Sequence, residues 1–206
     1  ALEGNLGFSY IDRQPVLDKV MDRLWPTLKL MLTVLIISLL IGVPVGIISA
    51  VRQYSFLDYA VTVLGMISVS IPSFFLALVL IYFFALRLDW LPATGMFTVG
   101  QQRTFTDSFQ HLILPATALG LAQAAPIIRY TRASLLEVIS HDYTTVARAK
   151  GLSERTVIVR HALRNVLIPL VTIVALDIPR LLGGTVVIEQ VFAWPGMGTL
   201  AITSVF

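Results

Sequence analysis

Cysteine is absent from this chain of 206 residues, and charged residues make up only 13% of it. Without cysteine the chain can form neither a disulfide framework nor a thiolate metal site. The charged fraction is well below the roughly 25% of an ordinary soluble domain. Hydrophobic residues account for 56% of the chain, and its mean hydropathy is +0.83. A soluble fold could not bury so much apolar surface, so the composition indicates a membrane protein.

Motifs for nucleotide binding and for hydrolysis are missing as well. The only lysines are Lys19, Lys29 and Lys150, and none belongs to a GxxxxGK[ST] phosphate loop. Neither HExxH nor GxSxG occurs, and the three histidines are scattered at the ends of apolar runs, where we expect them to be solvated. We therefore expect no catalytic residue, cofactor or metal in this chain. The net charge of +3 comes without an interleaved basic and aromatic pattern, so we expect no nucleic-acid partner.

Four long apolar runs predict an all-α, polytopic membrane helix bundle. They cover about residues 27–51, 57–86, 112–128 and 166–188, and each is close to or above the length needed to cross a bilayer. The run over 112–128 is the shortest. Pro44 and Pro72 fall inside the first two runs, and we expect both to break these helices internally, because each leaves a backbone carbonyl without its helical partner. Such carbonyls need neighbouring helices or a water-lined path.

The first 25 residues mix charged side chains with apolar ones at helical spacing. This pattern predicts an amphipathic helix outside the spans. A helix lying on the membrane surface and a short helix packed against other protein fit the pattern equally well.

The segment 142–169 is the one long polar stretch between two apolar runs, and it holds five of the fifteen Lys and Arg residues. Its sequence predicts a helix, a turn and a second helix. Asp142 can cap the first helix, Gly151 can adopt the left-handed conformation after it, and Ser153 can cap the second. The segment also contains apolar residues of a kind that is usually buried, namely Val146, Ala147, Leu152, Val157 and Ile158. Together with the two caps and the glycine turn, they argue against a solvated connector that only sets topology.

The distribution of Lys and Arg predicts the orientation of the chain. Eight of them fall on the face that carries the polar segment, five on the opposite face, and Lys29 and Arg180 lie within spans. Because positive residues concentrate on the cytoplasmic side, we expect residues 129–164 to be cytoplasmic. The tryptophans Trp25, Trp90 and Trp194 fall at the opposite ends of the spans, as an aromatic belt would place them. The chain then begins and ends outside the cytoplasm, so we expect a further span before residue 1 and another after residue 206.

Four polar residues and one proline inside the apolar runs are candidates for a translocation path. They are Ser70, Pro72, Gln123, Asp177 and Arg180. Asp177 and Arg180 lie three apart on one helical face, so they can pair with each other or line a water-filled path. Serines in a span can line a path or bond back to their own helix carbonyls.

Several stretches resemble the permeases of ABC importers, in particular the dipeptide, oligopeptide, nickel and glutathione group. The resemblance extends from GFSYIDRQPV through SVSIPSF and ARAKGLSER to RHALRNVLIP and LLGGTVVIEQVFAWPGMG, and so covers nearly the whole chain. The polar segment looks like the cytoplasmic EAA loop of that family, and this resemblance is the main reason to expect that its apolar residues form a docking surface for a partner. Thr145 stands at the position of the glutamate that names the loop, so the role of that glutamate cannot be transferred.

The resemblance implies a MetI-like fold for residues 1–206 as one transmembrane permease domain, with four of six expected spans. It implies a bacterial plasma (inner) membrane, a second permease subunit, two cytoplasmic ATPases that bind ATP and magnesium, and an external solute-binding protein. The expected ATPase-coupling residues are those around the glycine turn, namely Thr145, Val146, Ala147, Arg148, Ala149, Lys150, Gly151 and Leu152. The alternative is a secondary transporter driven by an ion gradient, and an intramembrane enzyme is more remote.

Overall fold

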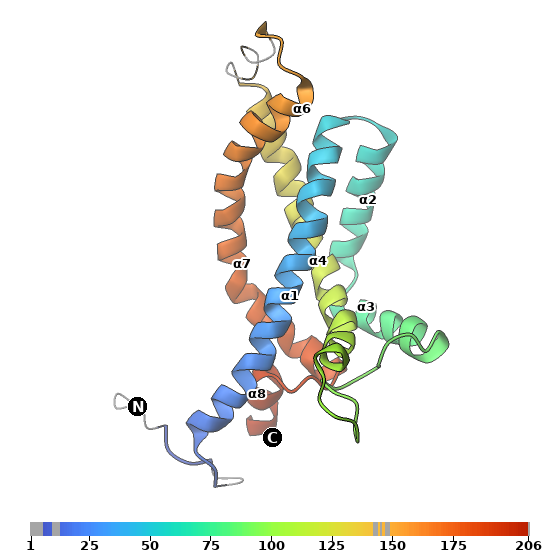
Figure 1. Ribbon diagram of the computed structural model, residues 1–206, viewed down its shortest axis with the longest axis vertical. Coiled ribbons are helices and arrows are strands. Elements are labelled where there is room, and N and C mark those ends of the chain that lie inside the picture. Colours follow the sequence, from blue (N-terminus) through green and yellow to red (C-terminus); the bar gives the residue numbers. More distant parts are fainter. Residues whose placement is uncertain (1–5, 10–12, 142–143, 145, 147–148, 206) are drawn as a thin grey trace. The chain divides into compact units, whose positions relative to one another are not determined.

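A computed structural model describes residues 6–9, 13–141, 144, 146 and 149–205 of the chain. Within them the fold is all-α (Figure 1), with an isolated β-bridge between Phe8 and Pro15. The chain divides into two compact units. Unit 1 comprises residues 1–34, 73–119 and 181–206, and unit 2 comprises residues 35–72 and 120–180.

The helices follow the apolar runs but are generally longer than they are. In order along the chain they are α1 (Val16–Val51), α2 (Phe56–Ser70), α3 (Ser73–Leu80), η1 (Ile81–Arg87), α4 (Phe105–Ile139), α6 (Glu154–Thr156), η2 (Val157–Ala162), α7 (Leu163–Val191) and α8 (Met197–Val205). In the described part of the chain, three helical stretches are long and apolar enough to cross a membrane, and a fourth is added if α2 and the α3–η1 helix count as one broken span.

The expected amphipathic segment over residues 1–25 is not separate from the first span. Helix α1 runs without interruption for 36 residues, so residues 16–25 form its first turns and the expected break at Pro44 does not occur. Helix α4 likewise extends the expected run 112–128 to 35 residues, with polar turns at both ends. Backbone hydrogen bonds continue through polar turns as readily as through apolar ones, so a hydropathy pattern marks the membrane-crossing part of a helix and not its ends.

The run 57–86 is divided in two at Pro72. Ile71 has an extended backbone (φ −83°, ψ 122°), which is the conformation that a following proline favours. Helix α2 therefore ends at Ser70, and α3 begins at Ser73.

In unit 2 the second half of α1 packs closely on α4. The contact is made at Gly42 and Gly46, where an added Cβ would lie 2.7 Å from Cβ of Ile127 and of Thr131, respectively. Small residues allow helix backbones to approach in membranes, where lipid provides no hydrophobic force for association. A buried cluster of Ala50, Leu135, Ile158, Ala162 and Val166 adds the start of α7 to this packing.

Candidate functional site

The turn at Gly151 lies between α4 and α6 and has the predicted geometry. Gly151 has φ +77°, a left-handed conformation that costs glycine little. The N–H of Lys150 donates to the carbonyl of Val146 (3.1 Å), which closes a helical turn just before the glycine. Ser153 caps α6 by accepting from the N–H of Thr156 (3.4 Å). Asp142, the other predicted cap, lies outside the described residues.

The apolar residues of segment 142–169 divide into two groups. Val157 and Ile158 are buried, with Ile158 in the cluster of unit 2, so they pack within this chain and do not argue for a partner. Val146 and Leu152, on either side of Gly151, are 51% and 40% exposed. Ala149 and Lys150 are also exposed. Thr145, Ala147 and Arg148 are outside the described residues.

A buried ion pair between Asp58 and Arg132 was not predicted from the sequence. Asp58 of α2 is 3% exposed and receives two hydrogen bonds from Arg132 of α4, from Nε at 2.7 Å and from Nη2 at 2.8 Å. The Ser49 hydroxyl of α1 and the backbone N–H of Tyr54 (3.0 Å) also donate to this carboxylate. The geometry is that of a bidentate arginine–carboxylate pair with its remaining acceptor sites filled. It joins three helices at one end of unit 2.

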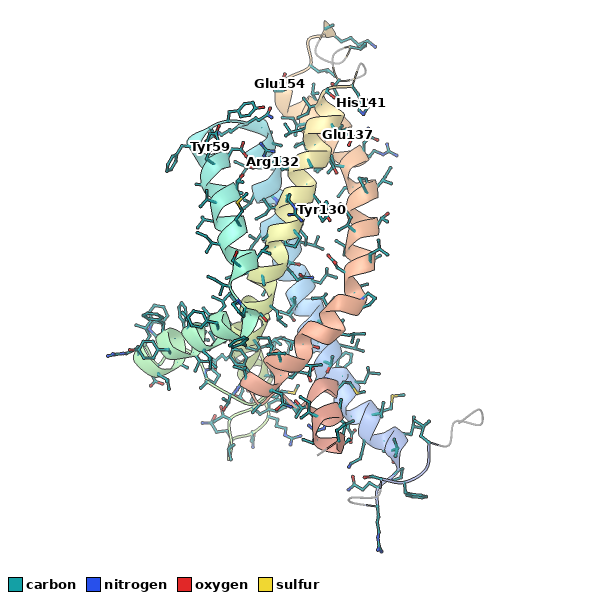
Figure 2. The ribbon with its side chains drawn as sticks, turned by 180° about the vertical axis from the view of Figure 1, so that it is seen from behind. Tyr59, Tyr130, Arg132, Glu137, His141 and Glu154 are labelled. Atoms are coloured by element: carbon teal, nitrogen blue, oxygen red, sulfur yellow. The ribbon has the colours of Figure 1, made fainter. Side chains whose placement is uncertain are left out.

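Arg132 belongs to the range 129–164 that we expect to be cytoplasmic, but its side chain is only 28% exposed and packs against Asp58. Figure 2 shows Arg132 on α4, with Tyr59 on the neighbouring α2. A signal for Asp58 was present in the sequence, since Ser55 and Asp58 have the S-x-x-D spacing of a capping box before an apolar run. In the structure Ser55 caps α2 by accepting from the N–H of Asp58.

The candidate path residues do not form one cluster. The Ser70 hydroxyl bonds back to the carbonyl of Met66 (3.0 Å), yet Ser70 also lines a pocket of about 400 Å³ between α2 and α4. Pro72 lies at the helix break, and Gln123 is half-buried on α4 outside that pocket. Asp177 is half-buried on α7, and the side chain of Arg180 is outside what the structure describes, so their pairing stays a prediction.

In unit 1 a buried glutamate of α7 is hydrogen-bonded to α1 and to the first turn of α8. Glu189 of α7 is fully buried, and its carboxylate accepts from the Thr27 hydroxyl (2.6 Å) and from the N–H groups of Gly198 (2.7 Å) and Thr199 (3.1 Å) in α8. A carboxylate is stabilised by the N–H groups of a helix N-terminus. A Cβ at Gly196 would overlap this carboxylate, and a Cβ at Gly198 would overlap Val186 of α7, which explains the glycines of the WPGMG stretch.

Hydrogen bonds from the middle of the loop between η1 and α4 hold this loop against its neighbours. Asp107 of α4 accepts from the backbone N–H (2.9 Å) and the hydroxyl (2.6 Å) of Thr98, and the N–H of Gly95 donates to the carbonyl of Phe192 (2.7 Å). His111, expected to be solvated, is buried, with Nε2 3.4 Å from Asp107.

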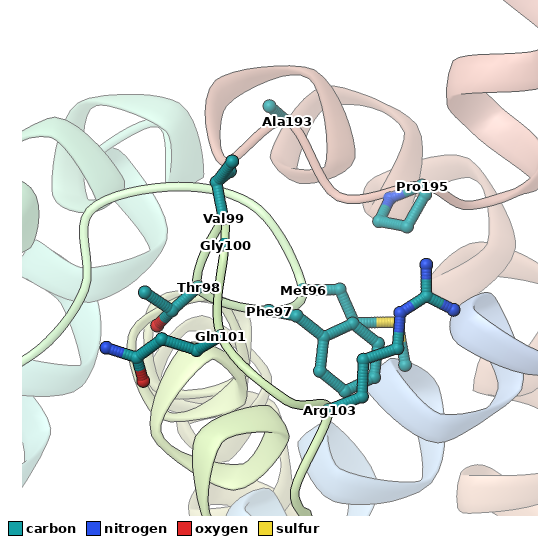
Figure 3. A pocket seen from close by; sticks show the side chains of 9 residues that line it. All are labelled: Met96, Phe97, Thr98, Val99, Gly100, Gln101, Arg103, Ala193 and Pro195. Carbon is teal, nitrogen blue, oxygen red and sulfur yellow. The ribbon is translucent and has the colours of Figure 1, made fainter.

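This loop borders a pocket of about 490 Å³. Figure 3 shows the guanidinium of Arg103 beside the ring of Phe97, with Pro195 nearby. Cζ of Arg103 lies 5.3 Å from the ring centroid, a cation–π distance.

The chain is similar to known transport proteins along its whole length. It is 43% identical to the oligopeptide transport system permease protein AppB of Bacillus subtilis, with all of this chain and 65% of that protein aligned. It is 46% identical to a putative peptide permease protein of Brucella suis, again over 65% of the relative. It is 42% identical to the glutathione transport system permease protein GsiC of Escherichia coli, over 64% of that protein. The chain thus spans about two thirds of the length of these relatives.

A solved structure supports the same fold. A chain of the MetNI methionine ABC transporter in an inward-facing conformation superposes with a TM-score of 0.69, over 88% of this chain and 77% of that one. The sequence identity is 22%, so this likeness establishes the MetI-like fold alone. The family model described as binding-protein-dependent transport system inner membrane component matches residues 42–206. The chain therefore belongs to the family of binding-protein-dependent inner membrane transport components.

Proposed function

We propose that this chain is the permease subunit of an ATP-driven ABC importer in a bacterial inner membrane. It would provide half of a path through the bilayer and carry out no chemistry itself. A second permease would provide the other half, and two cytoplasmic ATPases would bind ATP and magnesium. An external solute-binding protein would deliver the solute. The relatives named for oligopeptide and glutathione transport support a peptide, glutathione or a related solute such as a nickel chelate as cargo.

The observation that carries this proposal is the exposed apolar pair at the glycine turn. Val146 and Leu152 expose apolar side chains on either side of Gly151, while Val157 and Ile158 just beyond them are buried. Exposed apolar residues beside a rigid, capped turn suit a docking element. The turn would seat in a groove of an ATPase on the cytoplasmic side.

The anchoring of the turn supports a mechanical role. η2 and the start of α7 continue directly from α6, and their buried residues pack on α1 and α4 within unit 2. Movement of an ATPase that holds the turn would therefore be passed to packed helices. Closure of the two ATPases on ATP would move these helices as a body and switch the side to which the path opens.

The test is uptake by the full-length permease, reconstituted with its partner subunits in proteoliposomes. We expect accumulation of a labelled peptide only when binding protein is on one side and ATP on the side of the Gly151 turn. Collapsing proton and sodium gradients with ionophores should leave uptake unchanged. Uptake that follows an ion gradient without ATP would overturn the proposal in favour of a secondary transporter.

A further inference from the structure

The pocket between α2 and α4 in unit 2 has the dimensions of a small-molecule site. Its volume is about 400 Å³, within the range of ligand pockets in proteins. Helix α2 contributes apolar side chains such as Val61, Met66 and Val69, and α4 contributes two arginines, Arg129 and Arg132. An apolar pocket with a few polar groups is typical of sites that orient a small ligand.

The two arginines of this pocket differ in what they can offer a ligand. Arg132 is paired with Asp58 through two hydrogen bonds, so its charge is neutralised within the chain. Arg129 is exposed, and its guanidinium lies over the ring of Tyr130, with Cζ 5.6 Å from the centroid. Among the described residues, no acidic side chain forms an ion pair with Arg129. The pocket therefore carries one uncompensated positive charge, with a planar set of donors suited to a carboxylate.

The two hydroxyl groups that α2 contributes to the pocket can act as hydrogen-bond acceptors. Thr62 donates its proton to the carbonyl of Asp58 (2.8 Å), and Ser70 donates to the carbonyl of Met66 (3.0 Å). Their protons are committed to the helix, so their oxygen lone pairs are available to accept hydrogen bonds. The walls of the pocket therefore combine a cationic donor at Arg129 with hydroxyl acceptors on α2.

We infer that this pocket is a subsite for a small solute that carries both a carboxylate and N–H groups, with a dipeptide as the simplest example. Arg129 holds the carboxylate, the oxygens of Thr62 and Ser70 accept from the N–H groups, and the apolar wall of α2 contacts the side chains. This inference rests on the proposed import function, and it adds a place where the solute pauses within this subunit. An anionic lipid headgroup would use Arg129 but brings no amide N–H for the hydroxyl acceptors.

The experiment measures protection of a single cysteine in the pocket. The chain has no cysteine, and Gly65 lines the pocket with nothing within 4 Å of an added Cβ. Gly65→Cys in the full-length permease, with cysteines elsewhere replaced by serine, is assembled with its partners in nanodiscs. The rate of labelling by a small maleimide is then followed as a function of the concentration of dialanine or dialanine amide.

We expect dialanine to slow labelling, and its amide to need a concentration about tenfold higher, the loss of one charge-assisted hydrogen bond. Arg129→Gln should remove this preference for the acid, and Arg129→Lys should restore part of it. Arg52→Gln is the matched control, because Arg52 is exposed and does not line the pocket, and it should change nothing.

Several results would overturn the subsite. These are equal protection by acid and amide, protection that depends on phosphatidylglycerol in the nanodisc and not on dialanine, and no labelling because another subunit covers the pocket. ATP-driven uptake of dialanine is measured separately on the same preparations. Uptake without protection refutes the subsite and leaves the importer proposal standing, whereas protection without ATP-driven uptake supports the subsite and refutes the import of dipeptides.

Discussion

Asp58 shows how one carboxylate can order several helices. It sits at the first turn of α2, yet it receives donors from α1, from the turn before α2 and from α4. A buried charge is tolerated only when it is paired and its lone pairs are satisfied. Here both conditions are met, so the pair fixes the positions of three helix ends in unit 2.

Breaking the Asp58–Arg132 pair should destabilise the permease. Asp58→Asn removes the charge that balances Arg132, and we expect a loss of about 1 to 3 kcal/mol in stability. Arg132→Gln should cost a similar amount, and the double variant should cost less than the sum of the two. The measurement is a double-mutant cycle on the thermal unfolding of the detergent-solubilised permease.

The control for this cycle is Asp18→Asn, which neutralises an exposed carboxylate in the first turn of α1. We expect it to change stability by no more than about 0.5 kcal/mol. Strictly additive losses in the double variant would show that Asp58 and Arg132 act independently, contrary to the geometry.

At the residue scale, local conformations could be predicted from the sequence, but contacts between distant residues could not. Gly151 and Ser153 follow local rules of helix ends, so their conformations could be predicted from neighbours a few residues away. Asp58 and Arg132 are 74 residues apart, and their contact depends on α2 lying beside α4, which no periodicity in the sequence specifies. Val157 and Ile158 were assigned to a partner surface for the same reason, because an apolar pattern does not distinguish an internal neighbour from an external one.

At the scale of elements, the helices were predictable in kind and less so in extent. The apolar runs indicated the spans, because the energetics of lipid contact depend on composition. Pro72 was recognised as a helix breaker, but the sequence did not show that α2 and α3 would be separate helices, since a proline can kink a membrane helix or end it. The outcome depended on Ile71 adopting an extended backbone.

The turn between α4 and α6 should be sensitive to substitution at Gly151. A β-branched residue is strained at positive φ, and we expect Gly151→Val to distort the turn at a cost of about 1 kcal/mol or more. The added side chain meets open space, with nothing within 4 Å of its Cβ, so the effect is conformational and not steric. Membrane insertion and pairing with the second permease should survive. ATPase attachment, or the stimulation of ATP hydrolysis by loaded binding protein, should decrease.

The matched control is Gly183→Val on α7, an exposed glycine that also has nothing within 4 Å of an added Cβ but has no positive φ. It should retain ATPase attachment and stimulated hydrolysis, and Gly151→Ala should show the defect in milder form. Complexes are purified from each variant, the ATPase retained per permease is counted, and hydrolysis is measured with and without binding protein. Full coupling in Gly151→Val would mean that the turn only connects two helices.

At the scale of the whole molecule, α4 determines which residues lie on each side of the membrane. It is long enough and apolar enough to cross a membrane, it follows the loop that carries Arg103, and it precedes the turn at Gly151. Residues before and after it should therefore lie on opposite sides of the bilayer. The excess of Lys and Arg after α4 favours the cytoplasm for the Gly151 side.

Single cysteines on either side of α4 test this orientation. Thr104 caps the first turn of α4 and Ser153 caps α6, so replacing either would remove a helix cap. Gln102 and Lys150 are exposed and lie close to them in the sequence, and they make better sites.

In intact cells, Gln102→Cys should react with a membrane-impermeant maleimide, and Lys150→Cys should react only after the cells are opened. Between these two positions α4 is the only helix of the described residues that is long and apolar enough to cross a membrane. Labelling of both positions from the same side would therefore mean that α4 does not span the membrane. The orientation of the Gly151 turn, and with it the coupling to cytoplasmic ATPases, would then have to be abandoned.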